Sequence, residues 1–452
     1  MTIALAADAG VRESYARDAS GLHRLPDAVA RPTSADQLRE LLRMAHADGR
    51  AITAAGAQTS TTGASIAERG ILCSMRAMER IIDFDPSRGR VRVEPGVLLG
   101  DLDRAIAGEG WMFTPDPTSD QEATVGGAIA CNASGPRSLR HGATRPHVAA
   151  LDVVLADGRD FHTARSALEK NTVGFHPVQE PVDWFVGSEG TLGIVVAAEL
   201  RLQRRPAVQL GLAIPFPTAG AAFAFIIAAR ESTLAPRCLE YFDATAFTVA
   251  RDGAAQWAPG ARAMVYAEAT SDAAIDLDPW IALADAHGAV TDELRVFDGD
   301  RAIREARRLR HGVPAMMHER AAPHLAQGGR RISTDWAVPY PRLAKAIARS
   351  HAHCDVAGLP HPVTYGHAGN GHPHQNWVAV DPADVTRHEA VIAATLHDVI
   401  AMGGTVAAEH GIGKLKPKWL PLQLHPVQLG MLRAIKRELD PTAILAPGNL
   451  GL

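Results

Sequence analysis

The stretch TVGGAIACNASGP, residues 124–136, is a run of glycine and other small residues with few bulky side chains. Two similar runs accompany it, AAGAQTSTTGAS at residues 54–65 and GSEGTLGI at residues 187–194. Loops without bulky side chains allow backbone N–H groups to approach an anion closely, and serine or threonine hydroxyls add donors. Three such loops within about 140 residues therefore predict a site for one extended ligand that carries a pyrophosphate.

The 54–65 loop belongs to neither of the two common phosphate-binding motifs. It lacks the lysine of a P-loop, and it does not fit the GxGxxG pattern of a Rossmann fold. Read alone, this loop is more consistent with an ordinary turn than with a binding loop. The prediction depends on the three loops acting together.

Length and composition limit the class of protein. A chain of 452 residues with 46% hydrophobic and 21% charged residues predicts two or three soluble globular domains. A net charge of −4 does not suggest a nucleic-acid-binding surface, and the longest apolar runs are too short for a membrane helix of about 20 residues. Four dispersed cysteines without a CxxC pair argue against a disulfide scaffold, a zinc–thiolate site or an iron–sulfur cluster. With no signal-peptide pattern, a cytoplasmic location is expected.

The pattern of elements changes near Pro206. Before it, Ser34 predicts the start of a helix that runs through Ala45. The strands expected in this half are residues 90–97, 151–155 and 195–202. Beyond it, helices are expected at residues 219–229 and 280–286 and strands at 263–269 and 332–338.

The histidine-rich segment GHAGNGHPH, residues 366–374, is a candidate metal site. A Gly-Asn-Gly turn between His367 and His374 could fold the two imidazoles toward one point. His372 and His374 are expected on the same side of a short strand. Zinc and similar divalent metals accept imidazole and carboxylate ligands together. The alternative is a group of partly buried histidines that only form hydrogen bonds.

The segment EHGIGK, residues 409–414, adds an adjacent carboxylate and imidazole. Read alone such a pair means little, but together with the histidine-rich segment it could combine a base with the third protein ligand that a catalytic metal site needs. A zinc hydrolase that uses the same histidines without a cofactor is the rival interpretation. The three small-residue loops argue against it, because a hydrolase has no use for them.

These two segments resemble the signatures GHxGDGNxH and EHGIGxxK of the FAD-linked D-2-hydroxy-acid dehydrogenases. This family, within the vanillyl-alcohol-oxidase superfamily, includes D-lactate dehydrogenases, glycolate oxidase flavoprotein subunits and D-2-hydroxyglutarate dehydrogenases. The resemblance extends over roughly residues 20 to 450. It is also carried by RPTSADQLRELLRMAHADGRAITAAGAQTSTTG (31–63), PDPTSDQEATVGGAIACNASGPRSLRHG (115–142), KNTVGF (170–175), DWFVGSEGTLGI (183–194), LRHGVPAMM (309–317) and LDPTAILAPG (439–448).

The resemblance implies an α+β, two-domain fold. A PCMH-type FAD-binding domain would occupy residues 1–205. An α+β substrate or cap domain with the metal site would occupy residues 206–410, and a C-terminal segment, residues 411–452, would pack back on the FAD domain.

The resemblance also assigns site residues. The catalytic residues would be His410, as the base, and Arg310, which would pair with the substrate carboxylate. The metal, expected to be zinc, would be held by His367, His374 and Glu409. Non-covalent FAD would be bound by Ala55, Gly56, Ala57, Gln58, Thr59, Ser60, Thr118, Gly126, Gly127, Asn132, Ser134, His141, Gly142, Glu189, Gly190, Gly193 and Ile194.

The reaction implied is oxidation of a small D-2-hydroxy acid to the 2-oxo acid, with a proton abstracted from the metal-bound hydroxyl and a hydride transferred to flavin. Two positions favour D-lactate or glycolate as the substrate. Position 314 is Pro, and Ser333 stands where dicarboxylate-using relatives carry a second cation. Arg330 and Arg331 lie close by, so D-2-hydroxyglutarate stays an alternative. A role as the flavin subunit of a larger oxidase complex is another.

The chain departs from the family pattern at a few positions. Asn370 stands where the family usually has Asp, and His372 where it has Asn, so His372 is an additional candidate ligand. The other departures are Gln58, His141 and Ala446, in place of the family's glycine, tyrosine and asparagine.

The expected partners are the 2-hydroxy acid and an electron acceptor that the sequence does not identify. Neither a nucleic acid nor a transmembrane segment is expected. A homodimer, and a peripheral association with the inner membrane through the acceptor, stay open.

Overall fold

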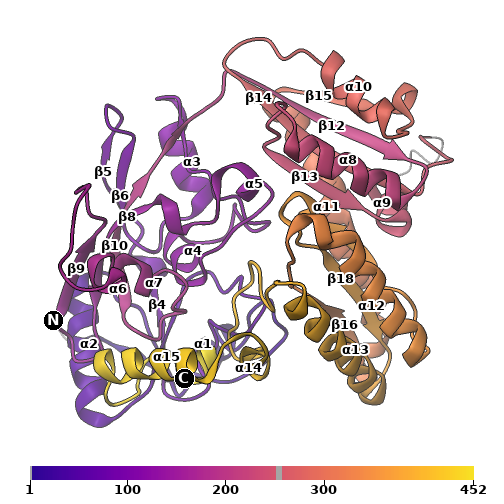
Figure 1. Ribbon diagram of the computed structural model, residues 1–452. Helices are drawn as coiled ribbons and strands as arrows, with labels where there is room; N and C mark the ends of the chain where they lie inside the picture. The colour runs from indigo at the N-terminus through magenta and orange to yellow at the C-terminus, as the bar shows by residue number, and fades with distance from the viewer. Residues whose placement is uncertain (1–2, 251–256) are drawn as a thin grey trace. The chain divides into compact units, whose positions relative to one another are not determined.

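The computed structural model describes residues 3–250 and 257–452 and divides into two compact units. The first unit comprises residues 1–135, 142–205 and 409–452, and the second comprises residues 136–141 and 206–408. The chain passes between the units at Gly135–Pro136, His141–Gly142, Arg205–Pro206 and Ala408–Glu409 (Figure 1). The last of these passages divides the EHGIGK segment from the histidine-rich segment.

The first unit contains a four-stranded sheet in which the adjacent strands β2, β4 and β3 run parallel. The 54–65 loop leaves the carboxyl end of one of these strands, the edge at which open parallel sheets commonly bind ligands. In sheet order the strands are β1 (Leu5–Ala6), β2 (Ala28–Ala30), β4 (Ile71–Ser74) and β3 (Ile52–Ala55).

The second sheet of this unit is antiparallel and has five strands. The strand expected at residues 90–97 ends at Val93, because Pro95 has no N–H to donate to a neighbouring strand. In sheet order the strands are β5 (Ile81–Asp85), β6 (Arg90–Val93), β10 (Ile194–Arg201), β8 (Val148–Val154) and β9 (Asp160–Ala164), and a separate ribbon pairs β7 (Trp111–Met112) with β11 (Gln203–Arg204).

Helix α2 (Ala35–Asp48) illustrates how local sequence sets a boundary in this unit. The Ser34 hydroxyl accepts a hydrogen bond from the Gln37 amide, and Gly49 ends the helix in the left-handed conformation. Its apolar face, which includes Leu38 and Leu41, is fully buried. The other helices are α1 (Ala9–Ser14), α3 (Leu99–Ala107), α4 (Val125–Cys131), α6 (His176–Gln179), α7 (Val182–Phe185), α14 (Leu420–Gln423) and α15 (Pro426–Leu439).

The C-terminal segment is bonded to the rest of the first unit. Lys436 Nζ, on α15, donates to the carbonyl oxygens of Thr191 (2.9 Å) and Leu445 (2.8 Å). The Ile52 amide donates to the carbonyl oxygen of Ile444 at 2.7 Å. These contacts fix the chain end against the parallel sheet.

The second unit is built on one antiparallel sheet of seven strands. The strand expected at residues 332–338 stops at Ser333. In sheet order the strands are β15 (Arg295–Asp298), β12 (Val208–Phe216), β14 (Ala263–Ser271), β13 (Cys238–Phe242), β17 (Val363–Gly366), β18 (His374–Ala379) and β16 (Arg330–Ser333).

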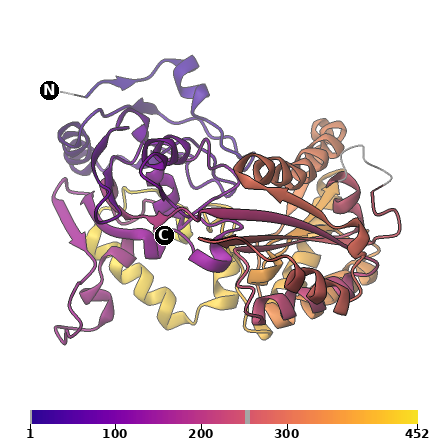
Figure 2. The same ribbon diagram turned by 90° about the horizontal axis from the view of Figure 1, so that it is seen from above.

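Helices cover both faces of this sheet (Figure 2). Alternation along β13 directs Glu240 to the face that packs against α11, while Tyr241 stacks on Phe223 of α8 on the other face. The helices are α5 (Ser138–His141), α8 (Ala219–Glu231), α9 (Ala244–Ala250), α10 (Asp278–Ala286), α11 (Gly299–Ala321), α12 (Leu343–Ala357) and α13 (Pro382–Ala401). Among the described residues, no helix combines the length and apolar character needed to span a membrane.

Candidate active site

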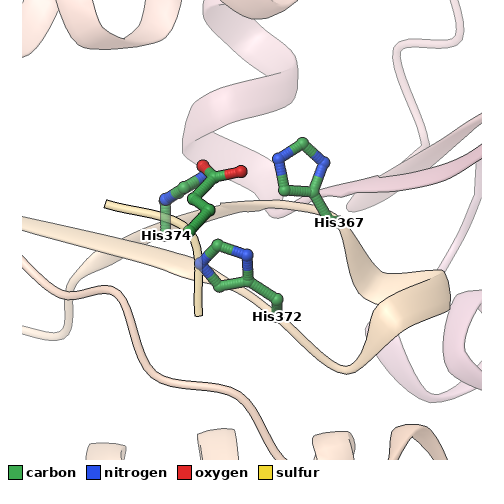
Figure 3. Close-up of side chains that lie close together, drawn as sticks. His367, His372 and His374 are labelled. Carbon is green, nitrogen blue, oxygen red and sulfur yellow. The ribbon is translucent and has the colours of Figure 1, made fainter. Parts of the chain in front are cut away.

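Three histidines of the second unit lie together around the turn that joins β17 to β18 (Figure 3). Their ring centroids are 5.3 Å apart for His367 and His372, 5.3 Å for His367 and His374, and 4.6 Å for His372 and His374. All three side chains are buried. The structure therefore brings His367 and His374 together and adds His372 to them.

The prediction that His372 lies on a strand with His374 is wrong. β18 begins at His374, and His372 belongs to the preceding turn. Gly371 adopts a φ of +70°, which changes the direction of the chain just before His372. The two imidazoles lie close together because of this turn rather than through strand alternation.

Glu240, on β13, orients the first imidazole. Its Oε1 accepts a hydrogen bond from His367 Nδ1 at 2.6 Å, and its Oε2 lies 3.2 Å from Arg310 Nε. Because a carboxylate only accepts, Nδ1 carries the proton and Nε2 of His367 presents a lone pair. A carboxylate bonded to the far nitrogen of an imidazole is the usual outer partner of a metal-binding histidine.

Arg310, on α11, contacts the imidazoles of both His367 and His374. Its Nη2 lies 3.1 Å from Nε2 of His367 and 3.1 Å from Nε2 of His374. A guanidinium can only donate, so both nitrogens are unprotonated acceptors, the form in which imidazole binds a metal. A metal ion on these nitrogens would therefore replace Nη2 as their partner, while Nε can remain with Glu240.

A second arginine–glutamate pair lies one helical turn away on the same face of α11. Arg307 contacts Glu268 of β14 at 2.9 Å, and Arg237 contacts the same carboxylate at 2.7 Å. Burial alone would raise the pKa of Glu268, but the two guanidinium groups hold that pKa well below its usual range. This carboxylate is therefore ionised, as the ion pairs require.

The backbone holds the histidine turn in place. The amides of Asn370 and His372 donate to the carbonyl oxygen of His367 at 2.9 and 3.1 Å, and the Val338 amide donates to the carbonyl oxygen of Gly371 at 3.0 Å. A Cβ atom at Gly371 would lie 1.9 Å from the Val338 oxygen, so only glycine fits there. The imidazoles are thus presented by a fixed turn.

The first unit brings the three small-residue loops together. The amides of Gly187 and Glu189, in the third loop, donate to the carbonyl oxygens of Ile129 (3.0 Å) and Ala130 (2.9 Å) in the second. A Cβ atom on Gly56, in the first loop, would lie 2.2 Å from Thr124 Oγ1 in the second. The loops therefore form one surface of small residues, as an extended ligand that carries a pyrophosphate requires.

Glu189 has a second role that the sequence did not reveal. Its carboxylate accepts hydrogen bonds from the amides of Ile412 (2.7 Å) and Gly413 (2.8 Å), and its carbonyl oxygen accepts one from Asn449 Nδ2 (3.0 Å). Glu189 itself has a positive φ of 52°. It therefore holds the EHGIGK segment against the third loop.

The two residues expected to act together in the EHGIGK segment are neighbours in space. Glu409 Oε1 lies 3.3 Å from His410 Nε2, and the His410 side chain is 30% exposed. The carbonyl oxygen of His410 accepts a hydrogen bond from Thr62 Oγ1 at 3.2 Å. His410 is thus fixed through its backbone while its imidazole remains accessible.

The remaining residues predicted to bind cofactor are distributed over both units. The run at residues 124–136 is not a loop throughout, because α4 occupies its first half. Asn132 ends α4 with a positive φ of 51°, and its Oδ1 accepts a hydrogen bond from the Arg145 amide. Thr118 is exposed. Gly142 belongs to the first unit and His141, at the end of α5, to the second.

Two functional candidates escaped the sequence reasoning, Glu240 and Asp335. Asp335 Oδ1 lies 3.2 Å from His372 Nε2, and both carboxylates are buried. The signal for Glu240 was available, because a lone carboxylate in the apolar strand CLEYF needs a buried partner. Asp335 lies outside regular structure and carries no such signal.

Comparisons with known proteins match these two parts of the chain. Residues 26–164 match the family described as an FAD binding domain, and residues 205–450 match the family described as the C-terminal domain of FAD linked oxidases. The chain belongs to the FAD-linked oxidases. The family resemblance and the PCMH-type FAD-binding fold expected from the motifs are therefore confirmed.

Named relatives of this FAD-linked oxidase span nearly its whole length. It is 29% identical to the glycolate oxidase subunit GlcD of Bacillus subtilis, over 96% of this chain and 91% of that one. It is 30% identical to a probable mitochondrial D-lactate dehydrogenase of Danio rerio (97% and 87%) and to a D-2-hydroxyglutarate dehydrogenase of Xanthomonas citri pv. viticola (94% and 89%). An alkyldihydroxyacetonephosphate synthase structure shares the fold, with a TM-score of 0.73, 16% identity and coverage of 98% and 82%.

Proposed function

We propose that this FAD-linked oxidase converts a small D-2-hydroxy acid, D-lactate or glycolate in preference, to the corresponding 2-oxo acid. The observation that carries the proposal is the contact of Arg310 with His367 and His374, two imidazoles held in the metal-binding tautomer. A carboxylate-binding guanidinium beside a metal-binding pair matches a substrate that carries a carboxylate and a hydroxyl on adjacent carbons.

The chain's own residues would divide the work. Arg310 would bind the substrate carboxylate through its planar fork and orient C2. His410 would remove the hydroxyl proton, and Glu240 would keep the charge of Arg310 balanced and His367 in its tautomer. A bound divalent metal supplies the polarisation that lowers the pKa of the substrate hydroxyl.

The residues present fit such a metal. Ring nitrogens of His367, His372 and His374 lie within 4.8 Å of one another. We propose His367, His374 and Glu409 as ligands of a divalent ion, with zinc favoured because it accepts imidazole and carboxylate together. Glu409 is proposed as a ligand because of the family signature, in which it immediately precedes the proposed base, His410.

The first unit fits FAD equally well. The surface formed by the three small-residue loops would receive the pyrophosphate at Ala55–Ser60, with residues of the second loop along the ribityl path and of the third loop toward the adenine. Non-covalent FAD, when bound, supplies the acceptor for the hydride that leaves C2.

Anaerobic addition of 2-hydroxy acids to the purified protein tests the function. Loss of the flavin's visible absorbance with D-lactate or glycolate, and not with L-lactate, is the expected result. We expect His410→Asn to keep its flavin but to be reduced about 10²–10⁴-fold more slowly. His176→Asn, at an exposed histidine of the first unit, serves as the matched control and should behave like the unsubstituted protein. A flavin-containing protein that none of the acids bleaches would refute the proposed substrate class.

D-2-Hydroxyglutarate is the second candidate, and Arg331 favours it. This arginine, on β16, donates to Asn376 Oδ1 (2.7 Å) and contacts His318 Nε2 (2.9 Å), and burial lowers its pKa. No carboxylate is recorded within ion-pair distance of Arg331 in the described part of the chain, so it could serve the second carboxylate of such a substrate. Bleaching by D-2-hydroxyglutarate alone would decide for this candidate.

A further inference from the structure

His372 stands at a position where the resembling family usually has asparagine, and it is the least satisfied of the three clustered histidines. Only 4% of it is exposed, and its Nε2 has no hydrogen-bond partner among the described residues. Asp335 Oδ1 is 3.2 Å away but out of line for a hydrogen bond. A buried polar atom without a partner costs about 1–3 kcal/mol, so its retention calls for a reason.

We infer that His372 is a third imidazole ligand, so that the second unit holds a divalent metal with His367, His372 and His374 together. Their ring nitrogens lie within 4.8 Å of one another, which small rotations of the side chains convert into a set around one ion. The inference rests on the metal proposed above, but not on the proposed oxidation.

A buried carboxylate lies near His367 and another near His372, but only the first is hydrogen-bonded to its imidazole. Glu240 lies 2.6 Å from one ring nitrogen of His367, and Asp335 lies 3.2 Å from one ring nitrogen of His372. Glu240 is hydrogen-bonded to Nδ1 of His367 and leaves its Nε2 for a ligand contact, whereas Asp335 lies beside Nε2 of His372 without a hydrogen bond to it. Nε2 of His372 is therefore still available to a metal ion.

The backbone around His372 is already fixed. Its amide is bonded to the His367 carbonyl oxygen at 3.1 Å, and the preceding Gly371 is bonded to Val338. The same segment continues to Asp335, whose carbonyl oxygen accepts from the Ala408 amide at 2.7 Å. Little ordering entropy remains to be lost when a metal binds, which favours tight binding.

A third imidazole changes which metals the site prefers. Imidazole suits zinc, copper, iron and nickel, whereas magnesium, calcium and manganese prefer oxygen ligands. A site with three imidazoles should therefore discriminate more strongly against the second group than a site with two. This preference is a property of His372 and not of the family signature, which has asparagine there.

Copper(II) bound to the flavin-loaded, chelator-treated protein tests the inference. Oxidised flavin is diamagnetic, so the electron paramagnetic resonance spectrum reports the copper alone. The superhyperfine splitting by ligand nitrogen nuclei gives the number of coordinated nitrogens. We expect one equivalent of copper with three imidazole nitrogens in the unsubstituted protein and two in His372→Asn. In competition with a chelator, the zinc affinity of the variant should be more than about 10-fold lower than that of the unsubstituted protein. Loss of an outer hydrogen-bond partner of a ligand already costs about 10-fold or more, and loss of a ligand should cost at least as much.

His361→Asn is the matched control, because His361 is an exposed histidine of the same unit that pairs with Asp355 at 2.9 Å. It should keep three nitrogens and the zinc affinity of the unsubstituted protein. If only two nitrogens coordinate copper in the unsubstituted protein, His372 is not a ligand, although the metal site itself stands. That result comes from the unsubstituted protein, so it does not depend on whether His372→Asn folds. Absence of bound copper would overturn the metal site itself. Flavin bleaching by a D-acid is scored separately, so that failure of the oxidation is distinguishable from both.

Discussion

Replacement of Glu240 by glutamine separates the metal site from the stability of the second unit. The Glu240 side chain is 3% exposed and contacts two groups at once, His367 Nδ1 at 2.6 Å and Arg310 Nε at 3.2 Å. Glutamine keeps the shape and one acceptor but leaves the guanidinium of Arg310 without its counter-charge. Breaking a buried ion pair costs about 3–5 kcal/mol, and the retained acceptor places the expected loss near the lower end. Loss of the carboxylate behind His367 should also weaken metal binding about 10–100-fold.

Glu268→Gln provides the matched control. Glu268 is fully buried and pairs with Arg237 and Arg307 on the same face of the sheet, and within residues 3–250 and 257–452 it contacts arginine and tyrosine side chains but no described histidine. It should lower the free energy of unfolding at least as much as Glu240→Gln and leave metal affinity unchanged. Urea unfolding gives the first quantity, and competition with a chromophoric chelator on folded, flavin-loaded protein gives the second. If both variants lose metal affinity by the same factor, Glu240 acts only through stability and the reasoning is refuted.

Three further predictions concern the first unit. Burial lowers the pKa of Lys414 to about 8, so the folded chain releases a proton that the unfolded chain keeps up to a pH of about 10.4. The free energy of unfolding should therefore rise, relative to Lys414→Met, by roughly 1.4 kcal/mol per pH unit between about pH 8 and pH 10, and a flat difference in urea unfolding would contradict this. Glu189→Gln should lower the free energy of unfolding by about 2 kcal/mol, because the oxygen that accepts from the Gly413 amide becomes an NH2 group and the hydrogen bond from the Ile412 amide loses its charged acceptor; an unchanged urea midpoint would be the contrary result. Gly56→Ala should cost about 1–3 kcal/mol and reduce the flavin-to-protein ratio, because its Cβ would meet Thr124 Oγ1, whereas Gly108→Ala, which meets nothing within 4 Å, should retain full flavin.

The sequence predicted best what local rules decide. Helix α2 was expected from Ser34 through Ala45 and runs from Ala35 to Asp48, because its cap, its apolar spacing and its terminating glycine are all local. The small-residue loops were recognisable for the same reason, since glycine and small polar residues limit the backbone wherever they occur. The family resemblance then supplied the fold as a whole.

What the sequence could not supply depends on strand pairing and turns. Glu240 reaches His367 because β13 pairs with β17, a contact between residues 127 positions apart that no spacing rule predicts. His372 was misplaced because alternation was extended backward through Pro373, where the chain is still turning. Asp335 was missed because it follows the end of β16 and carries no pattern of its own.

The two buried glutamates also explain how α11 is held against its sheet. Cys238 pairs with Glu268 and Glu240 pairs with Tyr266 across β13 and β14, so both carboxylates face the same helix. Arg307 and Arg310 stand three residues apart on α11, the spacing at which helical side chains are neighbours. Any other rotation of the helix would separate Arg310 from Glu240 and Arg307 from Glu268, and loss of a partner by a buried charge costs several kcal/mol. The charge pairs therefore specify one orientation of α11, and that orientation is what aims Arg310 at the histidine cluster.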